Sequence, residues 1–183
     1  MQPSALDFRT SMRIIACDRS RSGAMLAILN EAIENSTSIY DYQTRTAAMM
    51  TAWHDAKGQA GYPVIGAVDE ADRLLGFGSY GPFRAWPAYK YTVEHSLYVE
   101  RAHRSRGVGK LLLTELIAVA RRQDYHMLIG AIDAQNTASI ALHRRLGFEQ
   151  CAYVREAGFK FNRWLDLSFY QLLLDTPAHP ADG

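Results

Sequence analysis

A basic, glycine-containing turn between a strand-like run and a helix-like run constrains this chain most. Residues 101–110 read Arg-Ala-His-Arg-Ser-Arg-Gly-Val-Gly-Lys; they follow the strand-like run 91–99 and lead into the helix-like run 111–123. The first turn of a helix exposes unpaired N–H groups and a partial positive charge, and glycine lets the backbone approach a ligand closely. The segment therefore predicts a strand–turn–helix unit that binds phosphate. The other elements of the fold must be arranged around this unit.

Two common phosphate-binding patterns do not fit this turn. The P-loop pattern requires glycine where Arg104 stands and serine or threonine where Leu111 stands. The dinucleotide-binding pattern requires a third glycine where Leu112 stands. The pattern that remains is Arg104-x-x-Gly107-x-Gly109. Taken alone, these ten residues also suit a basic surface loop without a ligand.

The composition indicates one globular domain and excludes several classes of partner. The chain has 183 residues, 48% of them apolar, and a formal net charge of +1, so a sizeable core is expected and a broad nucleic-acid surface is not. No apolar run has membrane-spanning length. Cys17 and Cys151 have neither metal-ligand spacing nor a disulfide framework. They indicate a reducing, cytoplasmic compartment and no metal.

Alternating strand and helix signals predict a single α/β domain. The expected domain covers residues 12–175, with a flexible N-terminal extension at 1–11 and a disordered tail at 176–183. The last two strands are expected to form a hairpin that turns near Gly158. Strands are expected at 12–17, 63–68, 74–80, 91–99, 126–132, 148–154 and 159–174, and helices from about 20 to 34, 44–57, 108–123 and 136–146.

The helix expected at 136–146 carries a second group of polar residues. Asn136, Ser139 and His143 fall on one stripe of this helix. Asn136 is a favourable N-cap, and Gly147 is a favourable C-terminal stop. In isolation, a capped surface helix with an incidental histidine explains these residues equally well. Their position after a phosphate-type turn and a buried strand is what makes them informative.

The segments, in this order, resemble the GNAT acyltransferase superfamily. Residues 104–109 resemble its pyrophosphate loop, and residues 136–148 look like its later motif. Together with residues 92–99 and 160–167, they are similar to the phosphinothricin acetyltransferase-like branch, which includes enzymes that acetylate methionine sulfoximine. The resemblance covers about 14–174. It implies a GNAT-type fold, with a mixed, mostly antiparallel central sheet flanked by helices.

The resemblance implies acetyl-CoA as co-substrate, held by three segments. In relatives, the basic turn binds the diphosphate and the asparagine of the later motif reaches the pantetheine arm. The end of the strand at 97–99 offers N–H groups to the acetyl carbonyl. The implied cofactor-binding residues are Leu97, Tyr98, Val99, Arg104, Ser105, Arg106, Gly107, Val108, Gly109, Lys110, Asn136 and Ser139.

Glu94 is the candidate catalytic base. Strand alternation places it on the face opposite that of Val93 and His95. A carboxylate inside a sheet costs free energy unless it is solvated or paired, and partial burial beside a cleft raises its pKa toward the range useful for accepting a proton from an ammonium group. A solvated glutamate on an exposed face is the alternative, and His95 is expected to be a core histidine. The resemblance makes His143 the candidate acid, because relatives often have a tyrosine there that is proposed to protonate the leaving thiolate.

The loop at 81–90 is expected to bind the acceptor, with residues 35–42 as the opposite wall. Cations and hydroxyl groups on this loop can hold a substrate carboxylate; a solvated surface loop is the alternative. The expected substrate-binding residues are Arg84, Pro87, Ala88, Tyr89 and Glu94, with Lys90 beside them.

The leading functional hypothesis is an acetyl-CoA-dependent N-acetyltransferase acting on a small amino-acid-like amine of the phosphinothricin or methionine sulfoximine type. Direct attack in a ternary complex is expected, because neither cysteine has a base or cation motif beside it. The alternatives are a protein or peptide N-acetyltransferase and a non-catalytic acyl-CoA-binding module. The aromatic residues of 148–174 exceed what a small core needs, which predicts a homodimer.

Overall fold

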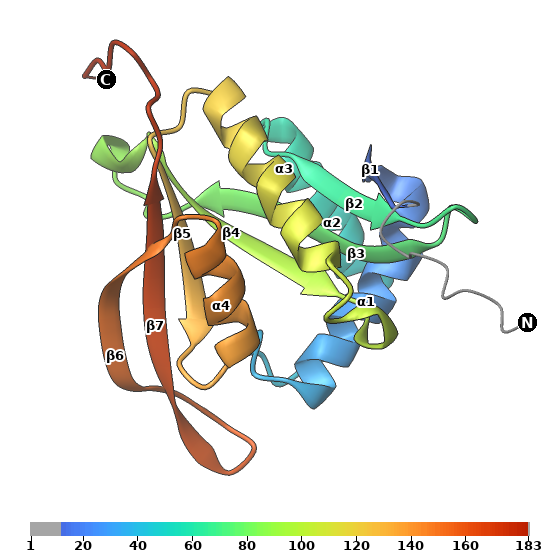
Figure 1. Cartoon of the computed structure of the whole chain (residues 1–183). Helices are drawn as coiled ribbons and strands as arrows, with labels where there is room; N and C mark the ends of the chain where they lie inside the picture. Colours follow the sequence, from blue (N-terminus) through green and yellow to red (C-terminus); the bar gives the residue numbers. More distant parts are fainter. Residues whose placement is uncertain (1–11, 183) are drawn as a thin grey trace, which may run out of the picture.

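A seven-stranded sheet with helices on both faces forms the protein in the computed structural model, which describes residues 12–182 (Figure 1). The strand order is β1-β2-β3-β4-β5-β7-β6, and every neighbouring pair is antiparallel except β4 and β5. The predicted mixed, mostly antiparallel sheet is therefore confirmed. The strands are β1 (Arg13–Ala16), β2 (Val64–Val68), β3 (Leu74–Pro82), β4 (Thr92–Val99), β5 (Met127–Asp133), β6 (Glu149–Lys160) and β7 (Arg163–Leu173).

Two hydrophobic clusters hold the helices on the sheet. One cluster joins α3 and α4 to one face, and the other joins α1 and α2 to the opposite face (Figure 1). Leu112, Leu113 and Leu116 are fully buried at helical spacing, so α3 anchors the larger cluster. Removing one such leucine side chain costs about 3 kcal/mol. The helices are α1 (Ser22–Asn35), α2 (Ala47–Gln59), α3 (Val108–Arg122) and α4 (Thr137–Arg145), with short 3₁₀ turns at Arg19–Arg21, Pro87–Tyr89 and Arg101–His103.

The parallel pair β4 and β5 is joined over a short length only. Its register runs from Thr92 opposite Met127 to Glu94 opposite Ile129. Both strands continue beyond this point, β4 to Val99 and β5 to Asp133. The two strands therefore separate after Glu94 and leave a wedge-shaped opening inside the sheet.

The β6–β7 hairpin differs from its predicted form at the turn. The chain reverses at Phe161 and Asn162, which have positive φ values of 51° and 56°, and not near Gly158, so that prediction is wrong. Gly158 instead lies where the β6–β7 register shifts. A Cβ atom there would be 2.6 Å from the ring of Tyr40. The glycine is therefore needed for a close approach and not for a turn.

The predictions made for the two ends of the chain have different outcomes. The predicted extension at 1–11 lies outside the described residues. Residues 176–182 form no helix or strand, although the Thr176 hydroxyl bonds to the carbonyl of Tyr125 and the Ala181 N–H to the Tyr91 hydroxyl. Disorder of this tail stays a prediction. Among residues 12–182, every helix is too short or too polar to cross a membrane.

Candidate active site

The wedge between β4 and β5 opens into a cleft of about 1220 Å³. The second half of β4 and the second half of β5 form its inner walls, and the start of α3, the start of α4 and the loop after α1 form its rim. Backbone groups of β4 that point toward β5 lack a strand partner beyond Glu94. Since buried backbone polar groups need hydrogen bonds, this edge suits a ligand that carries amide groups.

The start of α3 presents backbone N–H groups at one end of the cleft. Gly107 is the N-cap in the left-handed region, with φ of 91°, and no side chain caps the helix. Ser105 also has a positive φ of 61°, so the preceding turn curls around the helix end. Gly107, Gly109 and Lys110 line the cleft. The predicted phosphate-binding geometry is therefore present.

Arg104 braces this turn against two other elements. Its Nε donates to the carbonyl of Val99 at 3.2 Å, and its Nη2 pairs with Glu31 of α1 at 2.6 Å. The guanidinium also lines the cleft. Arg104 thus fixes the position of the turn in addition to contributing positive charge to the site.

Asn136 begins α4 on the opposite side of the wedge. Its Oδ1 accepts a hydrogen bond from the N–H of Ser139 at 3.1 Å, as expected of an N-cap. Both residues line the cleft. The cap leaves the side-chain NH₂ of Asn136 as a donor at the cleft wall.

Glu94 lies where the two strands separate, and its side chain is partly buried. Burial raises the pKa of this carboxyl, and the positive charge of Arg84 opposes the rise. The strand alternation is confirmed, because Val93 packs in the α3 cluster whereas Tyr98 packs in the α1 cluster. A half-buried carboxylate with a raised pKa, open to a cleft, suits a general base.

His143 lies in the floor of the same cleft and contacts His95. Their Nε2 atoms are 2.9 Å apart, and Nδ1 of His143 is 2.7 Å from the carbonyl oxygen of Ser139. Both histidines are buried, with exposed fractions of 7% for His95 and 3% for His143, so His95 is the core histidine that was expected. Burial lowers the pKa of both imidazoles, that of His95 to about 3.

The loop after α1, which includes the residues predicted as the acceptor wall (35–42), lines the cleft. Residues 35–38 and Tyr40 line the cleft, together with Phe161 and Arg163 from the hairpin. Arg163 donates to the side-chain oxygen of Gln135 at 3.0 Å. Phe161 and Arg163 were missed by sequence reasoning, since only the hairpin's fold brings them to the cleft.

Asp133 is a further cleft residue that the sequence reasoning missed. It ends β5, is 4% exposed, and one carboxylate oxygen has no hydrogen-bond partner among the described residues. Its other oxygen accepts from the N–H of Gln135. The signal that could have found it is an aspartate that ends a buried strand just before an N-cap asparagine.

None of the residues of the predicted substrate loop, 81–90, lines this cleft; of the predicted substrate-binding residues only Glu94 does. Arg84 is exposed, although it is close enough to influence the Glu94 carboxyl. Pro87 and Ala88 line a second, smaller cleft of about 460 Å³ with Tyr91 and the C-terminal residues. The structure brings the following predicted residues to the main cleft: Glu94, Leu97, Tyr98, Val99, Arg104, Ser105, Gly107, Gly109, Lys110, Asn136, Ser139 and His143.

Neither cysteine is placed as a nucleophile of the main cleft. Cys17 is buried in the α1 cluster, and burial raises the pKa of its thiol to about 11. Cys151 is exposed on β6, with its Sγ 3.5 Å from the carbonyl oxygen of Phe169. Within residues 12–182, no group of three or more histidine, cysteine, aspartate or glutamate side chains could hold a metal ion.

A diphosphate at one end and an amide-containing arm along its length are features of coenzyme A. The start of α3 suits the diphosphate, and the open edge of β4 suits the amide-containing arm. A carboxylate placed between that edge and the acceptor wall suits an amine acceptor. Fold and cleft together define an acyltransferase that uses a coenzyme A thioester.

Comparison with known proteins agrees, and the chain belongs to the acetyltransferase (GNAT) family, whose model matches residues 25–148. The L-methionine sulfoximine/L-methionine sulfone acetyltransferase of Pseudomonas paraeruginosa is 46% identical over 151 residues, which cover 82% of this chain and 88% of that protein. A phosphinothricin acetyltransferase structure from Sinorhizobium meliloti in complex with acetyl-CoA is 30% identical, with a TM-score of 0.89 and 93% coverage of both chains. The resemblance to this branch is confirmed, and the protein is an N-acetyltransferase.

Proposed function

We propose that this enzyme transfers the acetyl group of acetyl-CoA to the amino group of a small amino-acid-like substrate of the methionine sulfoximine or phosphinothricin type. The observation that carries the proposal is the single cleft that holds the start of α3, the open edge of β4 and Glu94. The relatives described above are named for their action on such substrates. A cleft walled by Tyr40 and Phe161 suits a small acceptor.

The proposed reaction is direct transfer in a ternary complex. Acetyl-CoA supplies the acetyl group, and its diphosphate is held at the backbone N–H groups of Gly107–Lys110, with its arm along Leu97–Val99 and Asn136. Glu94 accepts one proton from the substrate ammonium, directly or through water, so that the amine can attack the thioester carbon. The new C–N bond replaces the C–S bond. The second proton lost by the nitrogen ends on the coenzyme A thiolate, and the proton held by Glu94 returns to solvent.

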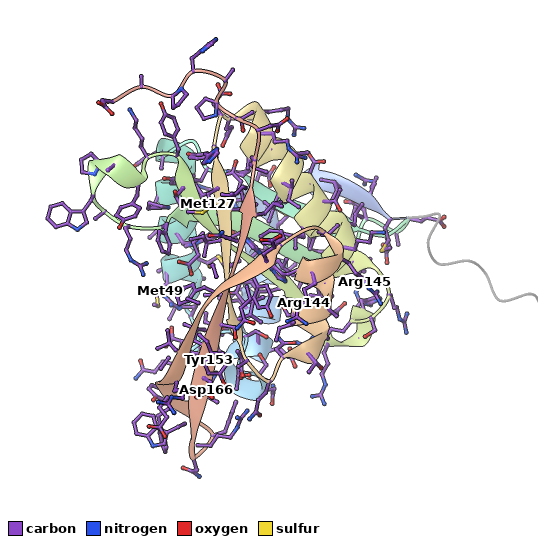
Figure 2. All side chains as sticks on the ribbon, turned by 60° about the vertical axis from the view of Figure 1, so that its left-hand side comes forward. Met49, Met127, Arg144, Arg145, Tyr153 and Asp166 are labelled. Carbon is purple, nitrogen blue, oxygen red and sulfur yellow. The ribbon has the colours of Figure 1, made fainter. Side chains whose placement is uncertain are left out.

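A second copy of the chain is the proposed partner of the β6–β7 hairpin. The hairpin extends beyond the rest of the sheet (Figure 1), and Tyr153, Phe159, Phe161 and Trp164 are each about half exposed on it. Figure 2 shows Tyr153 beside Asp166 on this hairpin, where the tyrosine hydroxyl donates to the carboxylate. An exposed aromatic surface of this kind suits a symmetric protein interface.

A panel of amines tests the substrate class. The panel contains methionine sulfoximine, methionine sulfone, phosphinothricin, free amino acids, a polyamine and a short peptide, each with acetyl-CoA and with thiol release as the readout. We expect the highest kcat/KM with one of the first three. Preference for the peptide would replace the proposal with a protein or peptide N-acetyltransferase. Acetyl-CoA binding without thiol release from any amine would favour the non-catalytic module.

A further inference from the structure

Two histidine rings are stacked beneath the cleft floor, where β4, β5 and α4 meet. The rings of His95 and His143 lie 5.1 Å apart between centroids with an interplanar angle of 23°, and their Nε2 atoms are 2.9 Å apart. Gly130 of β5 makes room for them. A Cβ atom at this position would be 2.9 Å from Cε1 of His95 and 3.0 Å from Nε2 of His143, so a larger residue would force the pair apart.

The hydrogen-bond partners fix where the protons of this pair lie. The Ser139 carbonyl oxygen can only accept, so the 2.7 Å contact from Nδ1 of His143 requires a proton on Nδ1. A neutral His143 then has a bare Nε2 that accepts a hydrogen bond. Nε2 of His95 must therefore be the donor, which leaves Nδ1 of His95 bare. That atom is buried without a hydrogen-bond partner among the described residues. The backbone of Ile129 on β5 also acts on this imidazole and partly opposes the lowering of its pKa.

The surroundings of the pair are apolar and aromatic. Phe148 packs against both rings, with centroids 5.5 Å from His95 and 5.0 Å from His143. The titratable groups that face His143 are His95 from β4 and, at 6.4 Å between centroids, Tyr170 from β7. The guanidinium of Arg144 lies 5.7 Å from the centre of the Tyr170 ring, which adds positive charge nearby. Burial disfavours an imidazolium ion at this place, and the hydrogen bond to the Ser139 carbonyl opposes this only in part.

We propose that His95 is a positioning residue whose Nε2–H group fixes His143 as the neutral Nδ1–H tautomer and so keeps this part of the cleft floor uncharged. The inference rests on the proposed function, in which an ammonium ion must enter the same cleft. An imidazolium there would repel the ammonium group of the acceptor. In this state His143 has no proton to give to the departing thiolate, whose proton comes instead from the attacking nitrogen.

Nitrogen-15 NMR of the full chain tests the tautomers without any substrate. We expect Nδ1 of His143 and Nε2 of His95 to carry protons, while Nε2 of His143 stays bare across the range in which imidazole ordinarily titrates. A proton on Nε2 of His143 in the wild-type enzyme would overturn the proposal. The NMR result does not depend on the amine panel. The proposed tautomers and the proposed substrate class can therefore be refuted separately.

Two variants of His95 test the consequence for the reaction. His95→Leu removes the donor, whereas His95→Gln keeps an N–H group near the position of Nε2. We expect the pKa of His143 to rise in His95→Leu and KM for the acceptor to increase about fivefold as the pH falls, the scale of one lost hydrogen bond, with KM for acetyl-CoA unchanged. His95→Gln should restore both values.

If the two variants had equal NMR spectra and equal pH profiles, the proposed role of the His95 Nε2–H group in fixing His143 would be wrong. Thermal melting and acetyl-CoA binding report whether each variant is folded. Where His95→Leu does not fold, Gly130→Ala takes its place, because its added Cβ separates the two rings. Gly130→Ala must then raise the pKa of His143 in the same direction, and an unchanged pKa would overturn the proposal.

Discussion

The ammonium group of Lys160 lies 2.8 Å from the carbonyl oxygen of Ser36, 124 residues away in sequence. The same nitrogen donates to the carbonyls of Ile33 at 2.6 Å and Ile39 at 2.9 Å. Lys160 is 5% exposed at the end of β6. One buried cation therefore holds the loop after α1, the proposed acceptor wall of the cleft, against the hairpin.

Lys160→Met should destabilise the protein and loosen the acceptor wall. Methionine fills similar space but leaves the three carbonyl oxygens without their donor, which costs about 1–3 kcal/mol for each group that water cannot reach. We expect a lower melting temperature and a KM that rises for the acceptor more than for acetyl-CoA. Arg122→Met, at an exposed ion pair on α3, is the control and should change neither. Equal effects on both KM values would contradict a role specific to the acceptor wall.

Glu94→Gln should lower kcat about 10²-fold or more near neutral pH, the usual scale of a lost general base. The shape of the side chain is kept, so acetyl-CoA binding should stay nearly unchanged. Glu149→Gln, at an exposed position on β6, is the matched control and should retain wild-type turnover. The position of the base would be wrong if Glu94→Gln kept full turnover while His143→Phe, folded, lost it.

The raised pKa of Glu94 also predicts the acidic limb of the pH profile. The base works only when ionised, so wild-type kcat should fall as the pH drops through the raised pKa of this carboxyl, which lies above that of an exposed glutamate. Glu94→Gln has no such group to titrate. Its remaining rate should increase with pH, because more of the acceptor amine is then neutral. A pH profile of kcat for both enzymes checks this difference.

Gly109→Asp should abolish acetyl-CoA binding. A Cβ atom at this position would meet Leu142 at 3.3 Å inside the cleft, and the carboxylate would repel a diphosphate at the start of α3. Gly107→Asp should act similarly and with added strain, since Gly107 has a φ of 91°. Thermal stabilisation by acetyl-CoA measures binding through mass action.

Gly23→Asp is the control for the glycine variants. It is an exposed glycine of α1 where a Cβ atom would meet nothing within 4 Å. This variant should be stabilised by acetyl-CoA as much as the wild type. Wild-type affinity in both turn variants would show that the diphosphate binds elsewhere.

Trp164→Ser should weaken self-association. Trp164 is 58% exposed and packs edge-on against Phe159, with ring centroids 5.1 Å apart. Light scattering should show a wild-type dimer at tens of micromolar, about the range in which a stable dimer persists, and a larger monomer fraction for the variant. A wild-type monomer at that concentration would refute the proposed interface.

The local signals of the sequence predicted most of the elements and several of the residues that line the cleft. Gly107 and Gly147 were placed at helix ends by their neighbours, and both have positive φ values. Glu94 and His95 were assigned to opposite faces of β4 by alternation alone, which the packing confirms. These predictions succeeded because propensity, periodicity and capping act over a few residues.

What the sequence could not show depends on contacts between distant elements. The His95–His143 bond needs α4 to pack over the end of the β4–β5 pairing, 48 residues apart. Lys160 resembles an ordinary surface lysine until the loop after α1 surrounds its Nζ. The turn at Phe161–Asn162 was missed because phenylalanine is a poor turn former, whereas Gly158 attracted the prediction although tertiary contact with Tyr40 explains it.

The three residue pairs that join β4 to β5 divide the sheet into two slabs, β1–β4 and β5–β7, that share only a short seam. Besides this seam, helix packing and the hydrogen bonds of Lys160 to the loop after α1 connect the two parts near the site. A coenzyme arm that forms hydrogen bonds to both strand edges would connect the two parts of the sheet across the gap. Binding of the donor substrate would then stiffen the part of the sheet that carries Glu94, so that the coenzyme itself would help to hold the base in position.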